Sequence, residues 1–222
     1  MEARVVCLSR TLGAGGEVIG HQVAAGLGFR YLDEEIISRA AGEAHVDADA
    51  AAAAEHNPPL LRRLLDRLSS AAAMVAAPSI LGTGGPLKAP GPELSPYLST
   101  ATELRPLIRA AIFEAATAGR AVIVAHAASI ALAGTAGVLR VLVTASPGTR
   151  AERLAALQGI PLDAARAAVA DSDRERREYF RDFYDLGEEL PTHYDLVLNT
   201  DTLTSDLVVA LVLEAAKNLP EV

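Results

Sequence analysis

Cysteine, lysine and aromatic residues are scarce in this chain, and each shortage excludes a class of protein. Cys7 is the single cysteine, which excludes an internal disulfide framework and a cysteine-based metal cluster. Lys88 and Lys217 are the two lysines, and neither lies near the glycines at 13, 15 and 16. No apolar run approaches the roughly 20 residues that a membrane-spanning helix needs. We therefore expect a cytoplasmic protein that does not depend on a membrane.

Positive charge is also in deficit. Lys and Arg total 20 against 28 Asp and Glu, which leaves a net charge of −8. Nonspecific binding to nucleic acid requires a basic surface, so nucleic acid is not an expected partner. A small phosphorylated ligand needs a few local arginines and is compatible with this charge. We expect a monomer or a homodimer that binds such a small molecule.

Apolar runs typical of buried strands alternate with segments of helical periodicity. Strands are predicted at residues 4–9, 29–32, 121–125, 138–144 and 196–199. Helices are predicted at about 18–27, 34–44, 103–118, 149–157, 163–184 and 205–217. In the first of these helices, the apolar residues that recur at helical spacing are Val18, Ile19, Val23, Ala24 and Leu27. The alternation implies parallel strands and predicts an α/β domain with a doubly wound sheet of five strands.

Residues 45–105 follow a different pattern. An alanine tract at 50–54 leads into helical periodicity around 60–74, and a stretch rich in Pro and Gly at 78–96 has no periodicity. We interpret this last stretch as a mobile loop. A passive insert and a segment that closes over a ligand explain it equally well.

A glycine-rich segment, Ser9–Glu17, follows the first predicted strand and opens the first helix. Backbone N–H groups of such a loop can surround a phosphate, and the helix N-terminus adds positive potential. Glycine is needed where φ is positive or where a Cβ would block the anion. The residues predicted to contact the phosphates of a bound nucleotide are Ser9, Gly13, Ala14, Gly15, Gly16, Glu17 and Val18.

The loop by itself allows three interpretations. Against the P-loop pattern G-x-x-x-x-G-K-[ST], Gly16 replaces the lysine and Glu17 replaces the hydroxyl residue. Against the dinucleotide pattern G-x-G-x-x-G, Gly13 and Gly15 fit and Asp33 could serve as the acidic residue, but Val18 stands at the third glycine. The third interpretation is a glycine-rich turn without a ligand.

Four segments resemble the cytidylate kinase-like family, and together they span almost the full chain. Segment 9–20, SRTLGAGGEVIG, is similar to the opening of that family, in which the P-loop lysine is commonly absent as well. In segment 31–39, Tyr-Leu-Asp is followed by Arg39, six residues after Asp33. Segment 173–180, DRERREYF, resembles the lid, and segment 193–201, HYDLVLNTD, resembles the last strand of the family.

This resemblance implies a three-layer P-loop kinase fold, with a parallel five-stranded sheet between helices on both faces. The whole chain, 1–222, would form a single domain whose core comprises 1–44 and 103–222. A helical insert at about 45–102 would bind the acceptor, and a lid would lie at about 150–187. The implied reaction is transfer of the γ-phosphoryl group of ATP, with Mg²⁺, to a CMP- or dCMP-like acceptor.

The resemblance also assigns roles to individual residues. The expected catalytic residues are Arg10, Asp33, Arg174 and Arg176, and Asp33 is in addition expected to orient Mg²⁺. Arg150 and Arg153 are expected near the adenine of the cofactor. The expected substrate-binding residues are Arg39, His126, Asp173 and Arg177. Because residues three apart share a helix face, Asp173 is expected to orient Arg176.

Three departures from the family lower the positive charge of the site. Gly16 stands in place of a lysine, Glu17 is an acid beside the loop, and His126 replaces an arginine that relatives carry in a Gly-Arg-Gly segment. A neutral histidine is a weaker cationic partner at pH 7. Two alternatives therefore stay open: a non-catalytic nucleotide-binding regulatory protein of the same fold, or a kinase for a different small acceptor.

Overall fold

The computed structural model describes residues 3–33, 101–124 and 128–219, with no side chains described for 101–108. By its internal contacts the chain divides into one unit of residues 1–34 and 112–222 and another of residues 35–111. The sheet and the described residues of the candidate site belong to the first unit. Predictions for Arg39, His126, the helix at 34–44 and the Pro/Gly-rich stretch lie outside the described residues.

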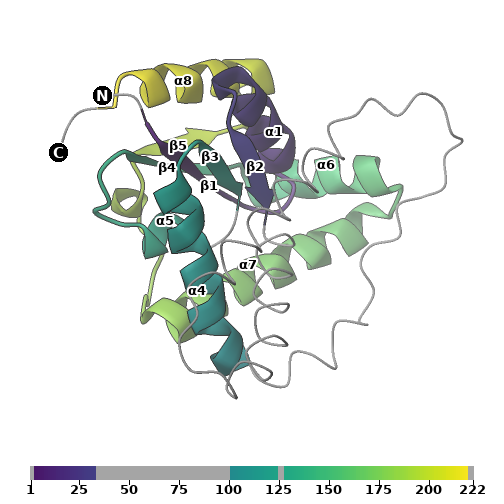
Figure 1. Cartoon of the computed structure of the whole chain (residues 1–222). Coiled ribbons are helices and arrows are strands. Elements are labelled where there is room, and N and C mark those ends of the chain that lie inside the picture. Colours follow the sequence, from purple (N-terminus) through teal and green to yellow (C-terminus); the bar gives the residue numbers. More distant parts are fainter. Residues whose placement is uncertain (1–2, 34–100, 125–127, 220–222) are drawn as a thin grey trace, which may run out of the picture. The chain divides into compact units, whose positions relative to one another are not determined.

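Strands and helices alternate along the described chain (Figure 1). The five strands are β1 (Val5–Arg10), β2 (Arg30–Asp33), β3 (Ala121–Val124), β4 (Val138–Thr144) and β5 (Leu196–Asn199). The helices are α1 (Gly16–Leu27), α4 (Ala101–Ala118), α5 (Ala128–Ala131), α6 (Pro147–Gln158), α7 (Leu162–Tyr184) and α8 (Ser205–Lys217), with a 3₁₀ turn at Pro191–His193. The predicted strands and helices in the described part are confirmed to within about two residues, which is the usual uncertainty of element ends.

The strands form one parallel sheet in the order β2-β3-β1-β4-β5. Strand β1 lies between β3 and β4, with Val5 level with Ala121 on one side and Val138 on the other. A central strand of a parallel sheet is covered on both faces, which explains the continuous apolar run from Val5 to Leu8. The predicted α/β class and parallel sheet are confirmed.

Side chains of β1 alternate between two layers of helices. Val6 and Leu8 belong to the main core, together with Ile19 and Val23 of α1 and Val208 of α8. Ser9, next along the strand, points to the opposite face, where its Oγ lies 3.2 Å from Oγ of Ser129 on α5. Helices therefore cover both faces of the sheet, with α1 beside α8 on one of them (Figure 1).

Val18, which is predicted to contact a bound nucleotide, is an exposed residue of α1. Val18 is 57% exposed, whereas Ile19 and Val23 of the same helix are fully buried. The buried face of α1 consists of Gly16, Ile19, Gly20, Val23 and Ala24. Val18 lies one position before that face, a rotation of about 100° around the helix axis, so it is turned away from the sheet.

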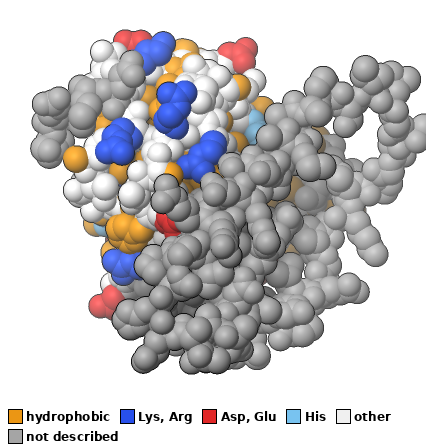
Figure 2. Space-filling view, viewed as in Figure 1, with side chains coloured by type: hydrophobic (Ala, Val, Ile, Leu, Met, Phe, Trp, Pro, Cys, Tyr) orange, Lys and Arg blue, Asp and Glu red, His pale blue; other side chains and the backbone are white. Residues whose placement is uncertain are grey.

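Figure 2 shows separate basic and acidic side chains on the described face, with hydrophobic and other atoms between them. Among the described helices, none is both long enough and apolar enough to span a bilayer.

Candidate anion-binding site

The carboxyl ends of β1, β4 and β5 meet at one edge of the sheet, where ligands of parallel α/β proteins usually bind. The loop Thr11–Gly15 leaves β1 there and enters α1. It is attached to β4 through Thr11, whose backbone N–H donates to the carbonyl of Val143 at 3.1 Å. The hydroxyl of Thr11 donates to the hydroxyl of Thr144 at 3.3 Å. The edge of the sheet thus holds the start of the loop in place.

Glycine is required at two positions of this loop for different reasons. Gly13 has φ of +82°, and a Cβ there would lie 2.6 Å from the carbonyl oxygen of Arg150, so a side chain is excluded by space as well as by conformation. Gly15 has φ of +83° and caps α1, and a Cβ there would meet no described atom within 4 Å. The loop therefore faces open space at Gly15, immediately before the positive end of the α1 dipole.

Arg10 and Glu17 form an ion pair across this loop. Nη2 of Arg10 lies 3.1 Å from Oε1 of Glu17, and the two side chains are 21% and 53% exposed. The Arg10 side chain lies over the backbone of Gly16, where a Cβ would come within 2.5 Å of the Arg10 Cβ. Nε of Arg10 is buried and has no hydrogen-bond partner among the described residues. The loop thus carries one cation with an unused buried donor and one carboxylate that partly neutralises it.

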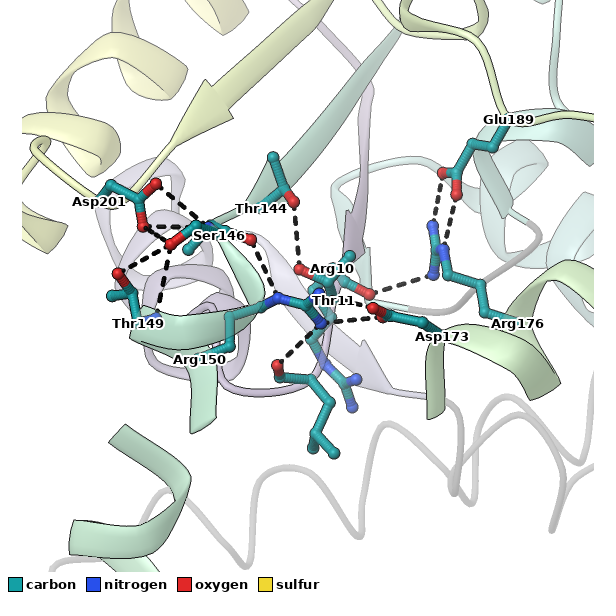
Figure 3. Close-up of polar contacts among 12 residues, drawn as sticks. Arg10, Thr11, Thr144, Ser146, Thr149, Arg150, Asp173, Arg176, Glu189 and Asp201 are labelled. Carbon is teal, nitrogen blue, oxygen red and sulfur yellow. Dashed lines mark hydrogen bonds and ion pairs between the residues drawn. The ribbon is translucent and has the colours of Figure 1, made fainter. Parts of the chain in front are cut away.

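Arg150, expected near the adenine, is a buried residue of α6 with 3% exposure. Its guanidinium binds both carboxylate oxygens of Asp173 on α7, at 2.8 and 2.6 Å (Figure 3). It also donates to the carbonyl oxygens of Ala145 at 3.0 Å and Leu12 at 3.4 Å. The structure brings Arg150 to the loop, but its donors point to protein atoms.

Arg176 is likewise buried and paired. Its guanidinium binds Glu189 through two hydrogen bonds of 2.7 and 2.6 Å and donates to the backbone carbonyl of Arg10 at 3.1 Å (Figure 3). The Phe180 ring lies 4.9 Å from its central carbon. Burial opposes the charged form, but the hydrogen bonds and charge of Glu189 raise the pKa of Arg176 above its usual value. The hydroxyl of Tyr194 also donates to Glu189.

The expectation that Asp173 orients Arg176 is wrong. Residues three apart on a helix are neighbours, but each of these side chains finds a closer charge on another element. Asp173 pairs with Arg150 of α6, and Arg176 pairs with Glu189 in the segment after α7. Both are bidentate pairs with a buried arginine, which is a stronger arrangement than a pair along one exposed helix face.

The other two α7 arginines of the predicted site are exposed. Arg174 forms a surface pair with Asp171 at 2.7 Å, with both side chains 55% exposed. Arg177 is exposed and forms no hydrogen bond or ion pair within the described part of the chain. These two side chains are therefore available to a ligand, whereas Arg176 is not in this arrangement.

The segment after β5 contributes Thr200 and Asp201 to the carboxyl edge of the sheet. Thr200 is buried and its hydroxyl donates to the carbonyl of Ala14 in the loop at 3.1 Å. Arg153, expected near the adenine, donates to that same hydroxyl at 2.9 Å. Asp201 accepts hydrogen bonds from the backbone and hydroxyl of Ser146 (Figure 3), and hydrogen bonds from Thr149 and Ser146 lower the pKa of Asp201. Thr200 therefore ties the last strand to the anion loop.

Three further predicted site residues are Asp33 and Ser9, at or next to the ends of strands β2 and β1, and Ala14, in the loop after β1. Asp33 ends β2 beside Val124 of β3. Ser9 and Ala14 have buried side chains, so Ala14 could meet a ligand through its backbone alone. The described residues contain no group of three or more His, Cys, Asp or Glu side chains that could hold a metal ion. A Mg²⁺ ion commonly uses one or two carboxylates with phosphates and water, and for that role Asp33 stays a prediction.

Sequence reasoning missed Glu189 and Tyr194, which contact the buried Arg176, and Asp201, which accepts hydrogen bonds from Ser146. It did place Thr200 at the end of the last strand, at the edge expected to face the nucleotide, and Thr200 contacts the loop there. Glu189 is 13 residues from Arg176, and Thr200 is 186 residues from Ala14. Tyr194 and Thr200 lie in the segment that carries the family resemblance, so their position was a usable signal. Nothing local distinguishes Glu189 from its neighbour Glu188.

A model of the cytidylate kinase-like family matches residues 5–202 of the chain. The chain belongs to this family. The resemblance found in the sequence is thereby confirmed, and with it a kinase-like P-loop fold. The curated proteins that were compared include no significant match.

Two solved structures show the same fold at low sequence identity. An uncharacterized protein from Eubacterium ventriosum ATCC 27560 is 11% identical, with a TM-score of 0.63, and the match covers 96% of this chain and 97% of that one. Shikimate kinase from Acinetobacter baumannii in complex with shikimate is 12% identical, with a TM-score of 0.50, over 96% and 92% of the two chains. At such identities these similarities concern the fold.

Proposed function

We propose that the protein is an ATP-dependent phosphotransferase that acts on a nucleoside monophosphate, with CMP or dCMP as the acceptor that the family favours. The observation that carries the proposal is the loop Thr11–Gly15 at the carboxyl edge of a parallel sheet. Its open side at Gly15 precedes the N-terminus of α1, which favours an anion. Nε of Arg10 supplies a buried donor without a partner in the described part of the chain.

These features fit the phosphates of ATP, although the P-loop lysine is missing. A buried donor left without a partner is costly, so a ligand oxygen near Arg10 would relieve that cost. The acceptor phosphate is already an anion, so transfer needs no general base. Positioning and charge stabilisation then provide the catalysis. Mg²⁺ would be held by Asp33 together with the phosphates, and its charge would stabilise the transferring group.

In this proposal the exposed arginines of α7 stabilise the transferring phosphoryl group. Arg177 follows Asp173 by four residues, so it lies one turn further along the helix face that reaches Arg150 and the loop. Arg174 lies one turn before Arg177 and can exchange its surface partner Asp171 for a ligand. Arg39 and His126 keep their proposed role at the acceptor phosphate.

The experiment is a coupled assay of ADP formation with ATP, Mg²⁺ and a panel of nucleoside monophosphates, supplemented by shikimate and small alcohols. The proposal expects turnover that is highest with CMP or dCMP. Turnover with a different acceptor would support a phosphotransferase but would contradict a nucleoside monophosphate as its acceptor. ATP binding without turnover of any acceptor would contradict the proposal that the protein is a phosphotransferase.

That last outcome corresponds to a second candidate, a nucleotide-binding regulatory protein without catalysis. The specific observation in its favour is that Arg10 is engaged by Glu17, while Arg150 and Arg176 are engaged by Asp173 and Glu189. Fewer cations are then left for the transferring group than a lysine-containing P-loop provides. Calorimetric titration with a non-hydrolysable ATP analogue, beside the turnover assay, separates the two candidates.

A further inference from the structure

Arg150 is the point where three separate elements meet the anion loop. It lies on α6, and its Nε donates to Ala145 just after β4, at 3.0 Å. Its two terminal nitrogens reach Asp173 on α7 at 2.8 and 2.6 Å. Nη1 also donates to the carbonyl of Leu12 within the loop at 3.4 Å. One buried side chain therefore connects α6, the end of β4, α7 and the loop.

The backbone of Arg150 shapes the loop as well. A Cβ at Gly13 would lie 2.6 Å from the Arg150 carbonyl oxygen and 3.0 Å from the Arg150 Cβ, so the loop passes directly over this residue. Leu12 packs against the apolar cluster between α6 and α7, which contains Leu154 and Val169. The position of residues 12–13 thus depends on contacts with α6 and α7 rather than on the sheet alone.

The donors of Arg150 are almost fully used by the protein. A guanidinium has five N–H groups, and Ala145, Leu12 and the two oxygens of Asp173 occupy four of them. The side chain is 4% exposed, so little of it can reach a ligand. Its charge is already neutralised by a bidentate carboxylate, the strongest common partner of arginine.

We propose that Arg150 is a positioning residue, which holds Leu12 and Gly13 in the anion-binding conformation and is itself held by Asp173. This role differs from direct contact with the nucleotide, and its value for catalysis rests on the proposed function. The two roles make opposite predictions for Asp173→Asn. Releasing an arginine that binds the nucleotide directly would increase affinity, whereas loosening a positioning arginine would decrease it.

The experiment measures the affinity for a non-hydrolysable ATP analogue by calorimetry and the hydrogen exchange of the loop amides at residues 11–16. For Asp173→Asn we expect at least tenfold weaker binding and at least tenfold faster exchange in the loop. The matched control is Asp163→Asn, which removes the partner of Arg166 in an exposed pair on the same helix, and it leaves both quantities unchanged. Tighter binding by Asp173→Asn, or unchanged exchange, would overturn the proposal.

A double variant separates positioning from general stability. Replacing the pair by apolar side chains, Arg150→Met with Asp173→Leu, removes both buried charges and commonly restores stability. We expect its melting temperature to approach that of the wild type, while analogue binding stays at least tenfold weaker because Leu12 has lost its donor. Restored binding in this variant would overturn the proposal. If the wild type binds no analogue while Asp173→Asn still accelerates exchange in the loop, the proposed function fails and the positioning role stands.

Discussion

Helix α7 places arginines in two different environments, one buried and one exposed. On the buried side, Arg176 is enclosed with Glu189 and the carbonyl of Arg10, and Asp173 holds Arg150. On the exposed side, Arg174 has a surface partner and Arg177 has none within the described residues. The burial of an arginine in a run of charges thus indicates whether protein atoms already use its donors, because a buried guanidinium must be neutralised by protein atoms.

The largest expected effect is on the buried side. Arg176→Ala leaves Glu189 in a partly buried position without its charge partner and removes the donor to the Arg10 carbonyl. Breaking a buried ion pair by removing one partner typically costs about 3–5 kcal/mol. We expect the free energy of unfolding to fall by about that amount in chemical denaturation. Loss of turnover in this variant would then report unfolding as much as catalysis.

The matched exposed change is Arg174→Ala, for which we expect a stability change within about 0.5 kcal/mol. A similar loss of stability in both variants would remove the distinction between the two sides of α7.

The next effect concerns activity on the exposed side. Arg177→Ala should lower kcat/KM by about 100-fold, the size expected when one donor to a transferring group is lost. Because Arg177 has no partner in the described part of the chain, the melting temperature should stay unchanged. Steady-state kinetics and thermal unfolding on the same preparations test both statements.

The control for this prediction is Arg166→Ala, an exposed arginine near the start of the same helix, which should retain full activity. If Arg177→Ala and Arg166→Ala have the same activity, Arg177 has no role in transfer.

The smallest effect lies at the loop. Glu17→Gln removes the carboxylate that competes for Arg10 and the negative charge beside the phosphate position. The pair is partly exposed, so its contribution corresponds to about 0.2–1 kcal/mol, and binding of an ATP analogue should tighten by about 1.4- to fivefold. Calorimetry at low and high salt measures the gain, which should shrink as salt screens the charges. Weaker binding would mean that Glu17 itself contacts the ligand or its metal ion.

The fold was accessible to sequence reasoning because its signals are local. Continuous apolar runs identified the strands, and helical spacing identified α8 to the residue. The glycine-rich loop was also recognised, because positive φ at Gly13 and Gly15 leaves few alternatives to glycine. Apolar spacing alone did not distinguish the exposed Val18 from the buried Ile19, because a shift of one position in a helix moves a side chain from the core to solvent.

The partners of the charged residues were not accessible in the same way. The pattern from 173 to 180 predicted a pair between Asp173 and Arg176, because neighbours on one helix are the pairs that a sequence displays. The observed partners come from α6 and from the segment before β5, 23 and 13 residues away. Such pairs form because folding brings charges together where water is excluded, which no local spacing encodes.

The sequence by itself determined the α/β class, the parallel sheet, the glycine-rich loop and the family, since each depends on residue types at short, fixed spacings. The tertiary structure alone decided which arginines are buried in ion pairs and which stay exposed. The physical reason is that the energy of a charge depends on its solvent exposure and on the nearest opposite charge, and both are set by packing between distant segments.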